Sequence, residues 1–118
     1  MIYQGSCHCG QVAFEVEGEV SATTKVMNCN CSMCARKGGL LWFVPRQALR
    51  LLSAEENLST YTFNKHAIKH RFCAKCGIHP FAEARSPSGE AMVAVNVRCL
   101  EGVDYAALPV KHFDGRAL

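Results

Sequence analysis

Seven of the eight cysteines lie in three tight clusters, and this grouping constrains the fold more than any other feature of the chain. The clusters are Cys7-His8-Cys9, Cys29-Asn30-Cys31-Ser32-Met33-Cys34 and Cys73-Ala74-Lys75-Cys76. Two pairs can join in one closed tetrahedral zinc site, whereas a triple supplies three ligands and leaves one position of the metal open. A closed site stabilises a fold, and an open one can support chemistry. We therefore predict two zinc ions per chain.

The first and third clusters are predicted to share the closed, structural zinc, with Cys7, Cys9, Cys73 and Cys76 as its ligands. One metal would then join the start of the chain to its second half and remove the freedom of a long loop from the unfolded state. Gly10 and Gly77 follow the second cysteine of each pair, where a glycine permits a tight turn.

Cys29, Cys31 and Cys34 are predicted to hold the open, catalytic zinc from a loop between strands. Three thiolates make such a centre electron-rich, so we expect it to prefer a fourth sulfur from an incoming thiol. Binding would ionise that thiol near neutral pH and hold it beside an electrophile. The chemistry favoured is the addition of a thiol to a small carbonyl carbon, or the reverse.

A fourth protein ligand would instead close the triple and make it structural. Cys99 is the first candidate, and His66, His70 and His112 are the others. With both metals structural, the chain would be a non-catalytic, zinc-stabilised module that binds a protein. Otherwise Cys99, which shares the apolar face of a predicted strand, would be a buried core residue.

Several other residues near the clusters could each have one of two roles. Arg36 and Lys37 directly follow the triple and could bind the carboxylates of a substrate, or could simply be solvated cations. Trp42 and Phe43 could line a pocket or belong to the core. His8 lies between two ligands but is predicted to point away from the metal.

Hydrophobic alternation predicts a mainly β domain over residues 1–118. Period-two patterns indicate strands at residues 12–17, 61–63, 68–72 and 91–97. A continuous apolar run before Pro45 indicates a central strand at 40–44, and the tail is expected to add an edge strand at 110–115. We find no linker, repeat or low-complexity segment in the sequence.

Charge and cysteine usage limit the partners and the compartment. The chain has no apolar stretch of about 20 residues and no signal-like amino terminus, so the expected location is the cytoplasm, without membrane contact. Thiols stay reduced there, which favours metal binding over disulfides. The formal charge of +3 counts cysteines as neutral. Seven thiolates and two Zn²⁺ together would subtract three charges, so we expect no nucleic-acid partner.

The sequence resembles the glutathione-dependent formaldehyde-activating enzyme (GFA) family. The motifs that carry the resemblance are Gly5-Ser6-Cys7-His8-Cys9-Gly10, Cys29-Asn30-Cys31-Ser32-Met33-Cys34-Ala35-Arg36-Lys37 and Phe72-Cys73-Ala74-Lys75-Cys76-Gly77. The segment from Lys69 to Phe81 is similar to the branch that contains centromere protein V.

This resemblance implies a fold of several short, coiled antiparallel sheets, shared with exchange-factor-like zinc proteins. It also implies the same division of the seven cysteines between a structural and a catalytic zinc. The implied reaction is that of a carbon-sulfur lyase, which joins glutathione to formaldehyde to give S-hydroxymethylglutathione.

Overall fold

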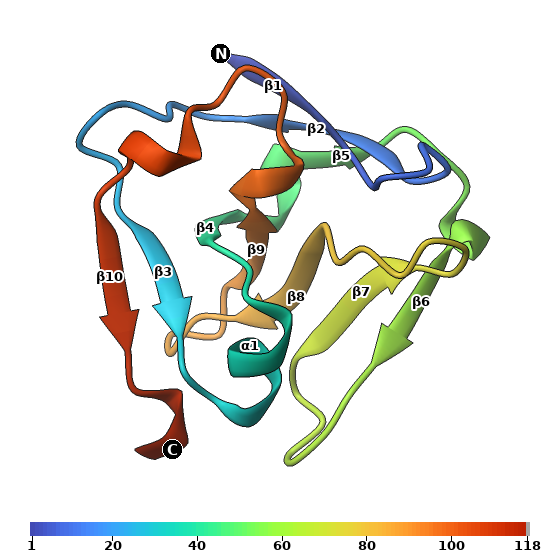
Figure 1. The fold of residues 1–118 in the computed structure, drawn as a ribbon. Helices are drawn as coiled ribbons and strands as arrows, with labels where there is room; N and C mark the ends of the chain where they lie inside the picture. Colours follow the sequence, from blue (N-terminus) through green and yellow to red (C-terminus); the bar gives the residue numbers. More distant parts are fainter. Residues whose placement is uncertain (118) are drawn as a thin grey trace.

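A computed structural model describes residues 1–117 of the chain, and within them two β-sheets carry most of the ordered backbone. In Figure 1 the small sheet lies across the top of the view and the large sheet extends below it. The strands are β1 (Ile2–Ser6), β2 (Ala13–Glu17), β3 (Val26–Cys29), β4 (Leu41–Pro45), β5 (Leu49–Leu51), β6 (Leu58–Tyr61), β7 (Lys69–Cys73), β8 (Phe81–Arg85), β9 (Ala91–Asn96) and β10 (Val110–Phe113).

Helical segments are short throughout the described range. The one α-helix there, α1, spans Ser32–Lys37, and the remaining turns are of the 3₁₀ type. The 3₁₀ turns are η1 (Arg46–Ala48), η2 (Glu55–Asn57), η3 (Val97–Cys99), η4 (Tyr105–Ala107) and η5 (Gly115–Ala117). None of these helices is long and apolar enough to cross a membrane. The mainly β fold predicted from the sequence is confirmed.

The two sheets have the strand orders β1-β2-β5 and β10-β3-β4-β9-β8-β7-β6. Every neighbouring pair is antiparallel except β10 and β3, which run parallel with Val110 opposite Val26 and Phe113 opposite Cys29. A parallel pair needs a long connection, and the segment after β9 supplies it by carrying the chain back to the start of β3. The tail is the edge strand that the sequence predicts.

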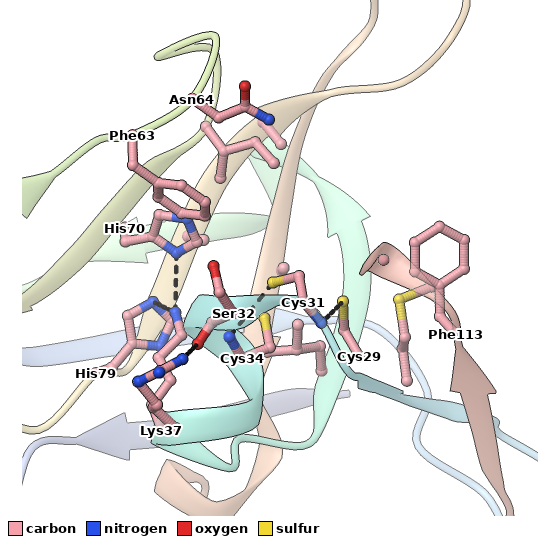
Figure 2. Close-up of a pocket in the computed structure, with 18 of the residues that line it drawn as sticks. Cys29, Cys31, Ser32, Cys34, Lys37, Phe63, Asn64, His70, His79 and Phe113 are labelled. Carbon is pink, nitrogen blue, oxygen red and sulfur yellow. Dashed lines mark hydrogen bonds between the residues drawn. The ribbon is translucent and has the colours of Figure 1, made fainter. Parts of the chain in front are cut away.

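One face of the large sheet forms the floor of a cavity, seen in Figure 2. Cross-strand pairing places Phe43, Ala94, Ala82 and His70 in one row across strands β4, β9, β8 and β7. All four residues line this cavity. Because side chains alternate along a strand, their neighbours in sequence point to the opposite face.

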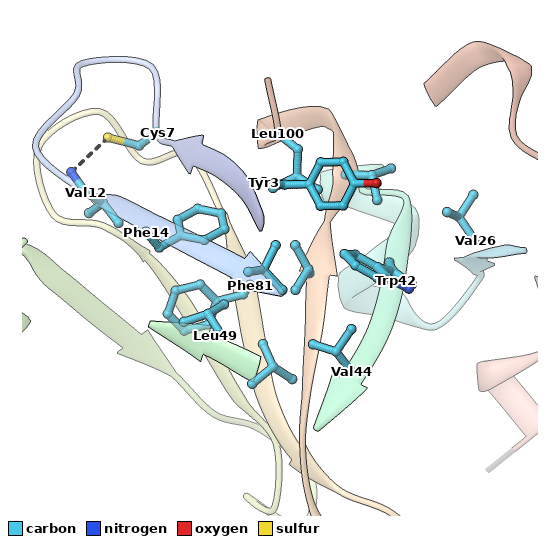
Figure 3. Close-up of a cluster of buried hydrophobic side chains, with 14 of the residues drawn as sticks. Tyr3, Cys7, Val12, Phe14, Val26, Trp42, Val44, Leu49, Phe81 and Leu100 are labelled. Atoms are coloured by element: carbon cyan, nitrogen blue, oxygen red, sulfur yellow. Dashed lines mark hydrogen bonds between the residues drawn. The ribbon is translucent and has the colours of Figure 1, made fainter. Parts of the chain in front are cut away.

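That opposite face packs against the small sheet and forms the main hydrophobic core, shown in Figure 3. Phe14 of β2 meets Phe81 of β8 edge-on, with ring centroids 5.8 Å apart. Tyr3 of β1 meets Trp42 of β4 in the same manner at 6.0 Å. Such aromatic pairs contribute about 0.5–1.5 kcal/mol each beyond the area that they bury. Trp42 is therefore a core residue, whereas Phe43 faces the cavity.

Candidate metal centres and pocket

Cys7, Cys9, Cys73 and Cys76 come together at one end of the two sheets, with their sulfur atoms all within 4.8 Å of one another. The Sγ–Sγ distance is 3.6 Å from Cys9 to Cys7, and also from Cys9 to Cys73, which lies 64 positions away in the chain. Four thiolates around a tetrahedral zinc would be separated by about 3.8 Å, given Zn–S bonds of about 2.3 Å. A disulfide would require about 2.05 Å. The donor set therefore fits zinc.

Tight turns after β1 and β7 direct backbone amides at this four-cysteine site. The amide of Val12 donates to Cys7 Sγ at 3.3 Å, and those of Lys75 and Cys76 donate to Cys73 Sγ at 3.4 Å. The bonds from the Cys76 and Lys75 amides lower the pKa of the Cys73 thiol. Gly10 and Gly77 have positive φ angles of 84° and 80°, which is the tight-turn role predicted for them.

Cys29, Cys31 and Cys34 form the second group, and their sulfur atoms also lie within 4.8 Å of one another. The prediction that this triple lies in a loop is wrong in part. Cys29 ends β3, Cys31 caps the amino end of α1, and Cys34 lies inside that helix. The Cys31 sulfur accepts the Cys34 amide at 3.3 Å, as serine or aspartate does at many helix starts.

The three sulfurs are too close to ionise together without a compensating cation. Burial, followed by the hydrogen bond and charge of Cys31 and the charge of Cys29, raises the pKa of Cys34 to about 12. The pKa of Cys31 is lowered, although burial opposes this, because the Cys34 amide and neighbouring groups donate to its sulfur. A divalent metal would offset the charge of all three thiolates, so this donor set also fits zinc.

None of the four predicted fourth ligands joins the triple within the described residues. Cys99 lies in η3 near the other site, where burial and then the charges of Cys7 and Cys76 raise its pKa to about 11. It is half-buried, not fully buried as expected of a core residue. His66 bonds to Thr62 and His112 to Asn28. The site therefore keeps an open side.

That open side faces a cavity of about 640 Å³, lined by all three cysteines of the triple. Figure 2 shows them at one end, with Phe63 and His70 across from them. Arg36 and Lys37 both line the cavity, so the predicted substrate-binding pair is near the open site. The surroundings of these two residues differ. Arg36 is exposed and donates to the Ser32 carbonyl of its own helix at 2.8 Å, whereas Lys37 contacts two histidines.

Lys37 is the last residue of α1, and its side chain extends to the two histidines of the cavity wall, His70 and His79 (Figure 2). Its Nζ lies 2.8 Å from His70 Nδ1 and 3.0 Å from His79 Nε2. An ammonium can only donate, so both nitrogens act as acceptors and the ring protons belong on the other nitrogens. These other nitrogens, His70 Nε2 and His79 Nδ1, are buried and have no partner in the described residues. No acidic side chain pairs with Lys37 in that range.

Lys37, His70 and His79 form a basic cluster, in which both histidines are neutral near pH 7 because their pKa values are lowered far below that. Burial, followed by the charge of Lys37, lowers the pKa of His70 to about 4. Burial, Lys37 and His70, in that order, lower the pKa of His79 to about 3. Burial also lowers the pKa of Lys37, opposed by the negative charges of Cys34, Cys31 and Cys29.

The lowered pKa of His70 and its assigned causes can be tested by titration. Neutral imidazoles stabilise the fold above pH about 6.5, and this contribution is lost as the pH falls toward 4. We expect NMR titration to place the His70 midpoint near 4. In the Lys37→Met variant the midpoint should rise but stay below about 6.5, because burial remains. A midpoint unchanged by the substitution would contradict the assigned contact.

The carboxyl-terminal segment closes one side of the three-cysteine site. Asn30 donates to Asp114 at 3.0 Å, and its backbone carbonyl accepts Arg116 Nε at 2.7 Å. Gly115 lies so close that an added Cβ would come within 2.6 Å of Cys29 Sγ. Sequence reasoning missed these contacts, because only the β10–β3 pairing brings residues 114–116 to this loop.

Comparison with known proteins identifies a matching protein family and a similar protein of known structure. The family model for the glutathione-dependent formaldehyde-activating enzyme matches residues 2–113. A crystal structure of a Rhodobacter sphaeroides protein is similar, with a TM-score of 0.77 and 34% sequence identity. The match covers 92% of this chain and 99% of that one. Since the family model spans nearly the whole sequence, this chain belongs to the glutathione-dependent formaldehyde-activating enzyme family.

Proposed function

We propose that this protein is a zinc-dependent carbon-sulfur lyase that adds a small thiol, glutathione in the first instance, to an aldehyde such as formaldehyde. Cys29, Cys31 and Cys34 would hold the catalytic zinc, and the four-cysteine site would hold the structural one within a single domain of residues 1–118. A cytoplasmic location would keep these thiols reduced. The observation that carries the proposal is the three-sulfur cluster, which lacks a fourth protein ligand in the described range and opens into the cavity.

When bound, zinc in this site would supply a Lewis acid that lowers the pKa of an incoming thiol. The chain's own residues would do the rest. A thiolate that adds to a carbonyl carbon leaves negative charge on the oxygen, and Lys37 provides a positive charge in the same cavity. Its two histidine partners are neutral acceptors, so they hold the ammonium without cancelling its charge. Arg36, at the exposed side, could bind a carboxylate of the thiol peptide.

A rate measurement with zinc-loaded protein tests this function. Protein with two zinc ions per chain should accelerate the exchange between formaldehyde and S-hydroxymethylglutathione, measured by NMR, above the spontaneous rate. After cobalt replaces zinc, added glutathione should change the thiolate-to-cobalt absorption of the three-cysteine site. Absence of both effects in folded, metal-loaded protein would refute the proposal.

Removing the charge of Lys37 should slow the reaction without removing the metal ligands. We expect Lys37→Met to lower kcat/KM by about 100-fold, the usual scale for losing one preorganised group that stabilises an oxyanion. Lys25→Met is the matched control, and it should change kcat/KM by less than about threefold because Lys25 is exposed and lies outside the cavity. Steady-state kinetics on variants of verified zinc content provide the measurement. Equal losses in kcat/KM would contradict the role given to Lys37.

The alternative function is a non-catalytic module that binds a protein, as the similarity to the centromere protein V branch allows. That function needs no open metal position. The three-cysteine site argues against it, because Cys99 and the three candidate histidines do not join the cluster. An unresponsive cobalt spectrum, together with zinc retained at both sites, would favour this alternative.

A further inference from the structure

The floor of the cavity is formed by three small side chains on the large sheet, Ala82, Ala84 and Ala94, which we name the alanine floor. Ala82 lies opposite Ala94 in the pairing of β8 with β9. Alanine is depleted in strands, where branched and aromatic side chains pack better. On the other face of the same two strands lie Phe81, Val93 and Val95, all buried in the core. The cavity-side positions Ala82, Ala84 and Ala94 are thus small, whereas the core side of the same strands carries large side chains at Phe81, Val93 and Val95.

Large apolar side chains stand around this floor. Phe43 and Ile68 line the cavity and are 43% and 46% exposed. Phe63 stacks on His70 with ring centroids 5.4 Å apart. Cys34 packs against the cluster of Leu41, Ala82 and Ala94, so the floor begins directly beside the sulfur ligands. A reactant held at the sulfurs could therefore extend over the alanine floor.

The cavity is far larger than formaldehyde requires. Its volume of about 640 Å³ equals that of roughly twenty water molecules at about 30 Å³ each. Formaldehyde has two non-hydrogen atoms, whereas cavities of about 300–1,000 Å³ are typical for ligands of drug size. Formaldehyde itself would take up little of this volume, so the rest must hold the thiol or a larger aldehyde.

A peptide thiol does not match the floor chemically. The side chains of Ala82, Ala84, Ala94 and Leu41 offer no hydrogen bond, so peptide groups pressed against them would lose water without replacement. Three cations that could take carboxylates line the cavity, Arg36 and Lys37 from α1 and Arg116 from the tail, and none of them lies on the strands of the floor. The apolar floor therefore suits the other reactant.

We infer that the aldehyde carries an apolar substituent of about four to eight carbons, which packs on the alanine floor. This inference rests on the proposed function and defines its substrate class. In the reaction a carbon–sulfur bond forms and the carbonyl π bond breaks. The proton of the thiol ends on the aldehyde oxygen, so atoms and electrons balance without a further reactant. The substituent would hold the carbonyl carbon beside the sulfur ligands.

A homologous series of aldehydes tests this substrate class with glutathione as the thiol. From propanal to pentanal, we expect the KM for the aldehyde to fall about threefold per added methylene, as burial of apolar surface predicts. Glyceraldehyde, with as many non-hydrogen atoms as pentanal, should bind at least about tenfold more weakly than pentanal. Ala84→Leu should lower the ratio of pentanal to formaldehyde kcat/KM at least about tenfold, because it fills the floor.

Ala91→Leu is the matched control, since Ala91 is exposed on β9 and lies outside this cavity. It should leave the pentanal-to-formaldehyde ratio unchanged. A second readout needs neither turnover nor a stable Ala84 variant: 1-pentanol, an unreactive analogue, should shift the methyl NMR signals of Ala82, Ala84 and Ala94.

Two results overturn the inference in different ways. Acceleration with formaldehyde but no gain along the aldehyde series, together with unshifted alanine signals, would refute the apolar substrate and leave the proposed function standing. No acceleration with any aldehyde would refute the proposed function and this substrate class with it.

Discussion

Replacing Cys73 with serine is expected to unfold the protein. Cys73 is 1% exposed, packs in the core and supplies one of the four sulfurs that join the start of the chain to β7. A structural zinc contributes about 10–16 kcal/mol of apparent free energy, and a domain is stable by only about 5–15 kcal/mol. Losing one thiolate ligand should therefore remove most or all of the stability. Circular dichroism and zinc analysis of Cys73→Ser would measure this.

Cys99→Ser provides the matched control, because Cys99 lies outside both sulfur groups yet is also partly buried. Its cost should be about 1 kcal/mol, as for an ordinary point substitution at a half-buried position. The structural role of the four-cysteine site would be wrong if Cys73→Ser kept both its fold and its thermal midpoint.

Cys31→Ala should have the opposite pattern, with the fold retained and turnover lost. The three-cysteine site joins only β3 and the start of α1, which are close in sequence, so its metal closes a short loop. The substitution also removes the cap at the Cys34 amide, at a cost of about 1 kcal/mol. We expect one zinc per chain instead of two and a decrease in turnover of at least about 1,000-fold, comparable with the loss of an essential catalytic group.

Cys99→Ala makes the same chemical change at a cysteine outside the site, and it should keep two zinc ions and normal turnover. The measurements are zinc content, the thermal midpoint and the rate of S-hydroxymethylglutathione exchange on both variants. Normal turnover by a folded Cys31→Ala protein with one zinc would exclude the three-cysteine site as the catalytic centre.

The sequence predicts the local cysteine clusters well, because the spacing within each cluster is a local property. Cys31 and Cys34 are three positions apart, so one turn of chain brings their sulfurs together whatever the rest of the fold does. The helix around them was nevertheless missed, since cysteine is not a usual helix cap. A signal was present: Arg36 and Lys37 precede Gly38, which adopts a left-handed conformation at the helix end.

Alternation along a strand predicts which residues point to opposite faces of the sheet, but not which of the two faces packs against the core. Trp42 and Phe43 are adjacent, so they must point to opposite faces of β4. Either could have been buried, and only the packing of the small sheet against the large one decides that Trp42 is. Strand β8 was not predicted at all, because its alanines give a weak apolar pattern.

The basic cluster behind the open site could not be predicted, because its members have no common motif. Lys37 lies 33 positions before His70 and 42 before His79. Their contact depends on where α1 ends relative to β7 and to the turn before β8. The same holds for Cys99, a plausible fourth ligand by sequence that the fold places beside the other sulfur group.

By itself the sequence determined the mainly β class, the three local cysteine clusters and the family, because these depend on local spacing and short motifs. The tertiary structure decided that the first and third clusters meet, that the three-cysteine site lacks a fourth protein ligand in the described range, that Lys37 lines the same cavity, and that alanines leave room beside it. The physical reason is that a metal-binding loop needs only neighbouring residues. A pocket exists only where distant strands meet and their side chains leave space.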